Sequence, residues 1–195
     1  PVITGHAFAH LRVFRVRAAG RAVEHHEDRR RAERPCAVKI DAARRARHAR
    51  AGAAVQGAHG ADVVIGYGPH VLQSIETLPR PDGGTTLVAY SLGNFMTGMY
   101  YAKNAVGGLL GFDLTVRSTE NGPSISIDNI SFLPTVCHYN SSRSAFRVMP
   151  LSDYTEELCN EHGGQKYGSF TLTELYGYVR RSIPDEYLPD AILYK

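Results

Sequence analysis

The sequence changes character at about Gly60, and this boundary limits how much of the chain can form a conventional hydrophobic core. Residues 1–60 contain 13 of the 22 Lys and Arg residues but only 5 of the 19 Asp and Glu residues. The same segment has no Ser, Asn, Tyr or Met, and Leu11 is its one leucine. Folded domains use Leu heavily and Ser routinely. We therefore divide the chain into an atypical Ala/Arg/His-rich segment, 1–59, and a conventional domain, 60–195.

Three interpretations of residues 1–59 stay open. The first is a basic arm that binds nucleic acid or an acidic polymer, although Phe8 and Phe14 are its only aromatic residues and no nucleic-acid motif is present. The second is a helix over residues 41–54, whose apolar positions are nearly all Ala and would bury little surface. The third is an out-of-frame reading of a GC-rich gene, because Arg, Ala, Gly, Pro and His all have GC-rich codons. We expect no nucleic-acid partner.

The lengths of the apolar runs and the spacing of the cysteines argue against a membrane-spanning protein, a disulfide-rich protein and a zinc-knuckle protein. The longest apolar runs, such as residues 106–112, are far too short to span a membrane. Arg12, Arg15 and Arg17 interrupt any signal-peptide core near the start, so membrane attachment would need an N-terminal anchor that this sequence lacks. Three cysteines without CxxC spacing predict ordinary thiols rather than a disulfide framework or a zinc knuckle.

From Gly60 onward, turn signals separate strand-like runs. Residues 61–65 form a short apolar run closed by Gly66, which predicts a buried strand. The Pro- and Gly-rich stretch 79–84 predicts a turn before a β-branched strand at 85–90. Residues 107–116 and 124–132, separated by a polar loop, predict an antiparallel hairpin in which isoleucines alternate with polar residues.

The C-terminal region predicts helices. Asp153 with Glu156, and Thr171 with Glu174, each have the spacing of a capping box at a helix start. Apolar residues recur at helical spacing after Thr171, and Pro184 is expected to end that helix. These elements are expected to be structural.

The candidate site lies in the loop after the first strand, where the sequence reads Gly66-Tyr67-Gly68-Pro69-His70. The carboxyl end of a strand is where α/β proteins build sites, and glycines there allow close backbone approach. Taken alone, an imidazole in a loop is more often a hydrogen-bonded or solvated residue than a metal ligand.

Two ordered motifs resemble the bacterial capsule-synthesis proteins of the CapA/PgsA family. Residues 60–73 read GADVVIGYGPHVLQ, and about twenty residues later residues 90–95 read YSLGNF. In that family these motifs read roughly G-A-D-x-V-I-G-H-x-P-H-V-x-Q and Y-S-L-G-N-F. Residues 107–110, 132–135 and, less specifically, 146–151 also resemble the family, so the resemblance covers the C-terminal half of its domain.

The resemblance implies an α/β (α+β) domain with a calcineurin-like metallophosphoesterase fold, in which two packed sheets are flanked by helices. It makes His70 the candidate ligand of a divalent metal, Mn, Fe or Zn, which would activate water for hydrolysis. Gly66, Tyr67, Gly68, Pro69, Ser91 and Asn94 would support the site. The turn at Ser91 and Asn94 has an equally good interpretation as a buried β-turn in which Asn94 bonds its own backbone.

Departures from the family pattern predict an incomplete domain and an incomplete active site. Tyr67 and Gly68 stand where the family usually has a histidine, and the N-terminal family motifs, including one with Trp, are missing from a chain without Trp. The ligand-like cluster of His25, His26, Glu27 and Asp28 matches no family motif. Whether the chain is an enzyme therefore stays open.

Two functional hypotheses follow from the resemblance. The first is a cell-envelope or extracellular protein of poly-γ-glutamate-type capsule synthesis, a metal-dependent hydrolase or transferase present here in truncated form. The second is a non-catalytic protein on the same fold that binds capsule polymer or other capsule-synthesis proteins.

Overall fold

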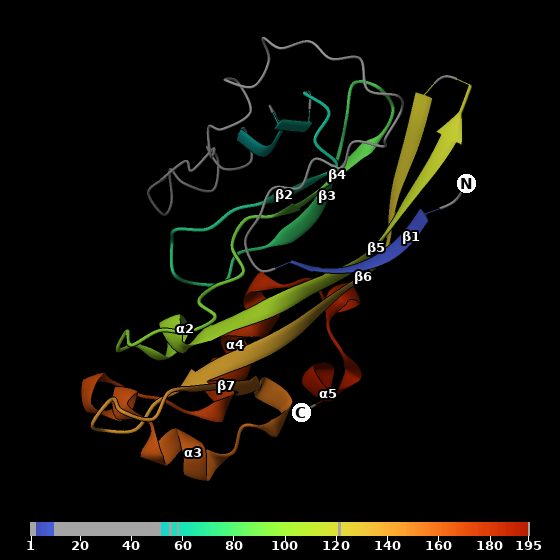
Figure 1. Ribbon diagram of the computed structural model, residues 1–195. Coiled ribbons are helices and arrows are strands. Elements are labelled where there is room, and N and C mark those ends of the chain that lie inside the picture. The colour runs from blue at the N-terminus through green and yellow to red at the C-terminus, as the bar shows by residue number, and fades with distance from the viewer. Residues whose placement is uncertain (1–2, 10–51, 55, 58, 121, 195) are drawn as a thin grey trace.

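The computed structural model describes residues 3–9, 52–54, 56–57, 59–120 and 122–194, arranged as two small sheets and a set of short helices (Figure 1). Most of segment 1–59, with the His25–Asp28 cluster and most of the predicted 41–54 helix, lies outside the described residues. Within that segment, residues 52–54 and 56–57 are helical, and Ile3–Ala9 forms strand β1.

The larger sheet has four antiparallel strands in the order β1-β5-β6-β7. Its centre is the predicted hairpin, formed by β5 (Val106–Thr119) and β6 (Gly122–His138), and both strands are longer than the sequence predicted. Strand β7 (Arg147–Pro150) pairs with the end of β6, and β1 pairs with the opposite side of β5.

A bulge in the hairpin explains why the alternation of apolar residues in β6 shifts by one position. The β5–β6 register is interrupted between Gly111 and Asp113. Opposite this point, Asn129 has a φ of 50° and donates its side-chain N–H to Asp113 at 2.6 Å. Because an extra residue in one strand reverses which face the following side chains occupy, Ile127 and Ile130 both pack against the core.

The smaller sheet has three strands in the order β2-β4-β3. Strand β2 (Val63–Ile65) runs parallel to β4 (Thr85–Ala89), and β3 (Ile75–Pro79) pairs with β4 in the antiparallel direction. The predicted buried strand, the 79–84 turn and the following β-branched strand are therefore confirmed.

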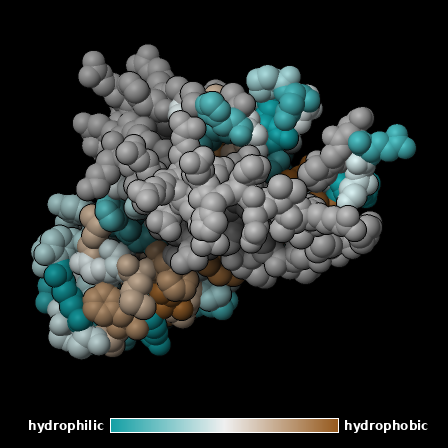
Figure 2. Space-filling view, turned by 45° about the horizontal axis from the view of Figure 1, so that its top comes forward, coloured by the Kyte–Doolittle hydropathy of each residue, from teal (hydrophilic) through white to brown (hydrophobic). Residues whose placement is uncertain are grey.

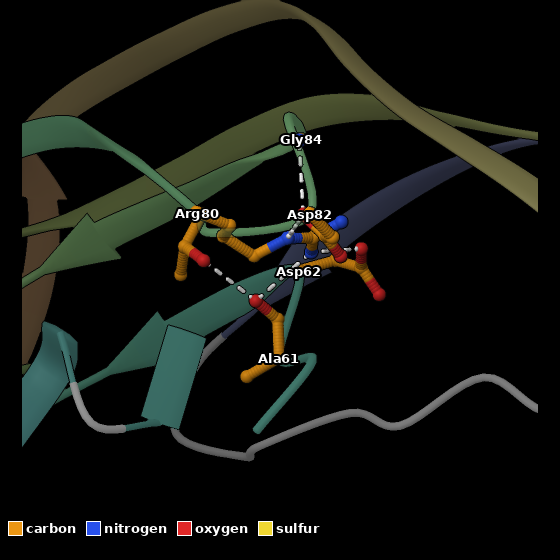
Figure 3. Close-up of polar contacts among 6 residues, drawn as sticks. Ala61, Asp62, Arg80, Asp82 and Gly84 are labelled. Atoms are coloured by element: carbon orange, nitrogen blue, oxygen red, sulfur yellow. Dashed lines mark hydrogen bonds and ion pairs between the residues drawn. The ribbon is translucent and has the colours of Figure 1, made fainter. Parts of the chain in front are cut away.

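Arg80 fixes the β3–β4 turn to the start of β2 (Figure 3). Its guanidinium forms a 2.7 Å ion pair with Asp62 and a 3.1 Å ion pair with Asp82, while its side chain is only 13% exposed. The pKa of the Asp82 carboxyl is lowered by two hydrogen bonds that it accepts. The larger effect comes from the Gly84 N–H and the next from the Arg80 side chain. The ion pairs cross-link the turn because the planar guanidinium presents several donors at fixed angles.

Short helices occupy the rest of the domain. Helix α2 (Ala102–Ala105) precedes β5, and the C-terminal region contains η1 (Leu151–Asp153), α3 (Glu156–Glu161), η2 (Gly163–Tyr167), α4 (Leu172–Ser182), η3 (Asp185–Tyr187) and α5 (Asp190–Leu193). The capping box at Thr171 and Glu174 is confirmed, and α4 ends before Pro184 as predicted. The box predicted at Asp153 and Glu156 is wrong, because Thr155 caps α3 and accepts the N–H of Leu158.

One hydrophobic cluster joins both sheets and the C-terminal helices. It includes Ile65 and Leu87 from the smaller sheet, Leu110 and Phe132 from the larger sheet, and Val179 from α4. In Figure 1 the long hairpin runs between the smaller sheet and the C-terminal helices. The expectation of an α+β fold with two sheets and helices is confirmed at this level. None of the described helices has the length and apolar character needed to cross a membrane.

Candidate functional site

His70 lies in the loop that follows β2, and this loop is anchored by Gly66. The Gly66 N–H donates to the Ala89 carbonyl at 2.7 Å, and a Cβ at residue 66 would lie 2.5 Å from the Tyr90 carbonyl oxygen. The loop turns sharply beyond this point, since Gly68 has a φ of 124° and His70 a φ of 58°. A left-handed backbone conformation is uncommon for residues other than Gly, so the surrounding turn holds the backbone of His70 in a specific conformation.

The side chain of Asn94 holds the His70 ring from one side. The Oδ1 atom of Asn94 lies 2.8 Å from Nδ1 of His70. The Nδ2 atom of Asn94 donates to the Asn104 carbonyl at 2.9 Å and to the His70 carbonyl at 3.3 Å, which fixes the orientation of the amide. Since Oδ1 can only accept, Nδ1 of His70 is assigned a proton, and in the neutral ring Nε2 then presents a lone pair.

Asn104, on α2, is the third residue of the hydrogen-bond network around His70 and Asn94. Its Nδ2 donates to the His70 carbonyl at 2.8 Å, and the residue is 4% exposed. Asn104 was not predicted as a site residue, because it lies in neither of the two motifs. The signal available in the sequence was an amide between Lys103 and Ala105 in a short helical turn.

The turn at residues 91–94 brings Asn94 to the His70 loop. Ser91 is buried, its Oγ accepts the Gly93 N–H at 3.2 Å, and its carbonyl accepts the Gln73 N–H at 3.0 Å. Gly93 has a φ of 70°, and a Cβ there would lie 2.5 Å from the Val106 carbonyl. Ser91 therefore stabilises the turn, whereas the Asn94 side chain bonds His70 and Asn104.

The remaining predicted residues line the same loop. Tyr67 is 52% exposed, Gly68 is exposed and Pro69 is half-buried. The structure thus brings His70, Asn94 and Ser91 to one edge of the smaller sheet, with Tyr67 at its rim. A functional role for this group stays a prediction.

The described residues do not form a complete metal centre. No group of three or more His, Cys, Asp or Glu side chains is placed to hold a metal ion within the described ranges. The side chains bonded to the His70 network are amides, and a divalent metal needs several convergent ligands. His70 alone does not satisfy that requirement.

A second group of titratable residues is buried near the C-terminal helices and was not predicted. His162 is 1% exposed, stacks on Phe170 at 3.8 Å between ring centroids, and bonds the Gly164 N–H and the Cys137 carbonyl. Burial lowers the pKa of His162 to about 4. His138 bonds the Tyr154 hydroxyl at 2.7 Å, and burial lowers its pKa as well.

The two described cysteines are consistent with ordinary thiols. Cys137 and Cys159 are both buried and free. Burial raises the pKa of Cys137 and raises that of Cys159 to about 12, so neither forms the reactive thiolate at neutral pH. Cys36 lies outside the described residues.

Comparison with protein families supplies the observation that bears most directly on function. Residues 24–99 match the family model described as bacterial capsule synthesis protein. The matched range contains both motifs, and it also includes residues 24–59 of the Ala/Arg/His-rich segment. It ends before residues 107–110, 132–135 and 146–151, whose resemblance stays a prediction. No curated protein and no solved structure matches the chain.

Proposed function

We propose that this protein takes part in bacterial capsule synthesis at the cell envelope, where it handles the capsule polymer. The observation that carries the proposal is the family match over residues 24–99. The contact between His70 in the first motif and Asn94 in the second adds support, because it joins the two motifs into one local structure.

The test is genetic and is made in the source organism. Deletion of the gene should reduce surface-attached capsule polymer, and the wild-type gene should restore it. The variants Asn94→Ala and His70→Ala should restore less polymer than His59→Ala, which changes an exposed histidine in a turn outside the site. A capsule that is unchanged by the deletion would contradict the proposal.

The polymer that we propose is of the poly-γ-glutamate type, on the resemblance of the two motifs. The enzymatic form of the proposal is a metallophosphoesterase-like hydrolase or transferase. It is supported by the orientation of His70, because histidine ligands generally donate their second ring N–H to an oxygen partner. His70 donates Nδ1–H to Asn94 and leaves Nε2 available in an exposed loop. Around this loop the described residues supply the His70 imidazole and no complete ligand set.

The second candidate function is non-catalytic binding of the polymer or of another capsule-synthesis protein. Exposed apolar and aromatic side chains favour it, since Phe95, Met96, Met99, Tyr100 and Tyr101 follow Asn94 directly and are 38–62% exposed. On the face shown in Figure 2, apolar surface gathers at the lower left. Contiguous exposed apolar surface marks interaction sites more often than scattered apolar residues do.

Metal analysis of the purified protein separates the two candidates. Stoichiometric Mn, Fe or Zn that is lost in His70→Ala and retained in His59→Ala supports the enzymatic form. A folded protein that binds none of these ions after dialysis against them supports the binding function.

A further inference from the structure

A pocket of about 300 Å³ lies between α2 and the region around the start of α4, two helices that pack against each other in Figure 1. The side chains that line it include Tyr100, Tyr101, Lys103, Ser169, Glu174 and Tyr178. Helix α2 contributes to two places, since Asn104 bonds the His70 loop and the adjacent Lys103 lines the pocket. None of the residues that line the pocket bonds the His70 loop, so the pocket is distinct from the His70 network.

Tyrosine rings form the walls of this pocket, and one of them is held in place from two sides. Tyr100 packs on Tyr167 with ring centroids 4.2 Å apart, and the Arg143 guanidinium lies 4.1 Å from its ring centroid. Tyrosines held in this way offer flat apolar area together with a hydroxyl at the edge, at a small cost in side-chain entropy.

Polar groups of both charges reach the same pocket. Lys103 lies 5.9 Å from the Tyr101 ring centroid and has no ion pair among the described residues. Glu174 accepts hydrogen bonds from Ser169 and Thr171, and all of these bonds end on its Oε2 atom. The ammonium of Lys103 donates, the second carboxylate oxygen of Glu174 accepts, and the tyrosine hydroxyls can do either.

The balance of charge selects the class of ligand. The Lys103 ammonium and the Glu174 carboxylate are the charged groups in the lining and cancel, whereas the Arg143 guanidinium lies against the Tyr100 ring outside the lining. The lining itself therefore gives no net attraction for a polyanion. A ligand with a flat C–H face and a rim of hydroxyl groups matches both the aromatic walls and the mixed donors and acceptors. The volume lies at the lower end of the range for ligand sites, roughly 300–1,000 Å³, which suits a single ring rather than a longer segment.

We propose that this pocket binds one neutral pyranose residue of a glycan, with the sugar ring against Tyr100 or Tyr178 and its hydroxyls bonded to Lys103 and Glu174. This site is separate from the His70 loop, and the proposal does not depend on the proposed role in capsule synthesis.

The test is a ligand titration of the full chain followed by NMR or calorimetry. The probes are methyl glucopyranoside, methyl N-acetylglucosaminide, glucuronate and a short γ-linked glutamate oligomer. At least one of the two neutral sugars should bind and should bind more tightly than either acid. The variants Lys103→Met and Glu174→Gln should each weaken that binding by about tenfold, the scale of one lost hydrogen bond to a charged group.

Matched variants keep the test independent of stability. Gln at position 174 can still serve a capping box, so Glu174→Gln should remain folded. Tyr194→Phe, in which the altered tyrosine is 85% exposed and outside the pocket, should bind like the wild type. The proposal is overturned if neither neutral sugar binds, if an acidic probe binds more tightly, or if Lys103→Met and Glu174→Gln bind like Tyr194→Phe.

Discussion

The Nδ1 atom of His70 lies 2.8 Å from the Oδ1 atom of Asn94, a residue 24 positions later in the chain. The bond joins the loop after β2 to the turn that follows β4. Asn94 also bonds two backbone carbonyls, so the orientation of one amide determines the tautomer of the imidazole.

Replacement of Asn94 should therefore change the tautomer of His70. In the wild type the proton should reside on Nδ1, whereas in Asn94→Ala it should redistribute toward Nε2. Loss of the amide should also lower the free energy of unfolding by about 1–2 kcal/mol. Long-range ¹H–¹⁵N NMR reports the tautomer, and urea unfolding reports the stability.

Two further variants control this experiment. Asn94→Asp keeps an oxygen acceptor and should keep the proton on Nδ1, while Asn160→Ala alters an exposed amide on α3 and should leave His70 unchanged. A wild-type spectrum with the proton on Nε2 would contradict the assigned hydrogen bond.

Gly107 should not tolerate a side chain, because it packs against the turn that carries Asn94. A Cβ at residue 107 would overlap the Asn94 carbonyl oxygen and would lie 3.1 Å from the Asn94 nitrogen. Gly107→Ala should lower the free energy of unfolding by about 1–3 kcal/mol through overpacking, and it should also displace Asn94 from His70.

Gly52→Ala is the matched control, since a Cβ there has no atom of another described residue within 4 Å. It should leave unfolding and the His70 resonances close to those of the wild type. If both alanine variants unfold at the same urea concentration, the close approach at Gly107 is wrong.

The elements predicted correctly from the sequence are those determined by neighbours along the chain. The 79–84 turn, the β5–β6 hairpin and the Thr171 capping box each depend on residues a few positions apart. The error at Asp153 has a local cause too. Two residues able to cap a helix stand close together, and the chain uses Thr155, whose hydroxyl reaches the Leu158 N–H.

Contacts between distant segments were not predictable in the same way. The motif resemblance indicated His70 as a candidate ligand and Asn94 as one of the supporting residues, but nothing in the sequence indicated that Asn104 bonds the His70 carbonyl. His138 is the last residue of β6, and His162 lies between α3 and η2. Their burial arises only when the chain at His162 packs against the end of β6. Such groups need the tertiary fold before their environment can be deduced.

Arg80 should contribute to stability more than an exposed arginine does. Arg80→Met would leave the Asp62 carboxylate, which is 22% exposed, without its 2.7 Å partner. The free energy of unfolding should fall by about 1–3 kcal/mol, as expected when a partly buried charged group loses its hydrogen bonds. Chemical denaturation at low and high salt measures the loss.

Arg117→Met is the control, because Arg117 is exposed near the end of β5. Its effect should be within about 0.5 kcal/mol. Equal unfolding midpoints for the two methionine variants would show that the Arg80 ion pairs in Figure 3 add no stability.

Acid should destabilise the protein through His162. The pKa of its imidazole is lowered by burial from 6.5 to about 4 in the folded protein. Between these values the unfolded chain binds a proton that the folded protein does not. The free energy of unfolding should therefore fall as the pH is lowered through this window, by roughly 3 kcal/mol in total. Urea unfolding at pH 7, 6, 5 and 4 measures this slope.

The variant His162→Gln removes the titrating ring, and its unfolding free energy should depend less steeply on pH between 7 and 4. It should also be less stable than the wild type at pH 7, because it loses the stacking on Phe170. His59→Gln alters an exposed histidine and should retain the full wild-type slope. If His162→Gln and the wild type show the same slope, the acid sensitivity arises elsewhere, and His138 is the next histidine to replace because burial lowers its pKa as well.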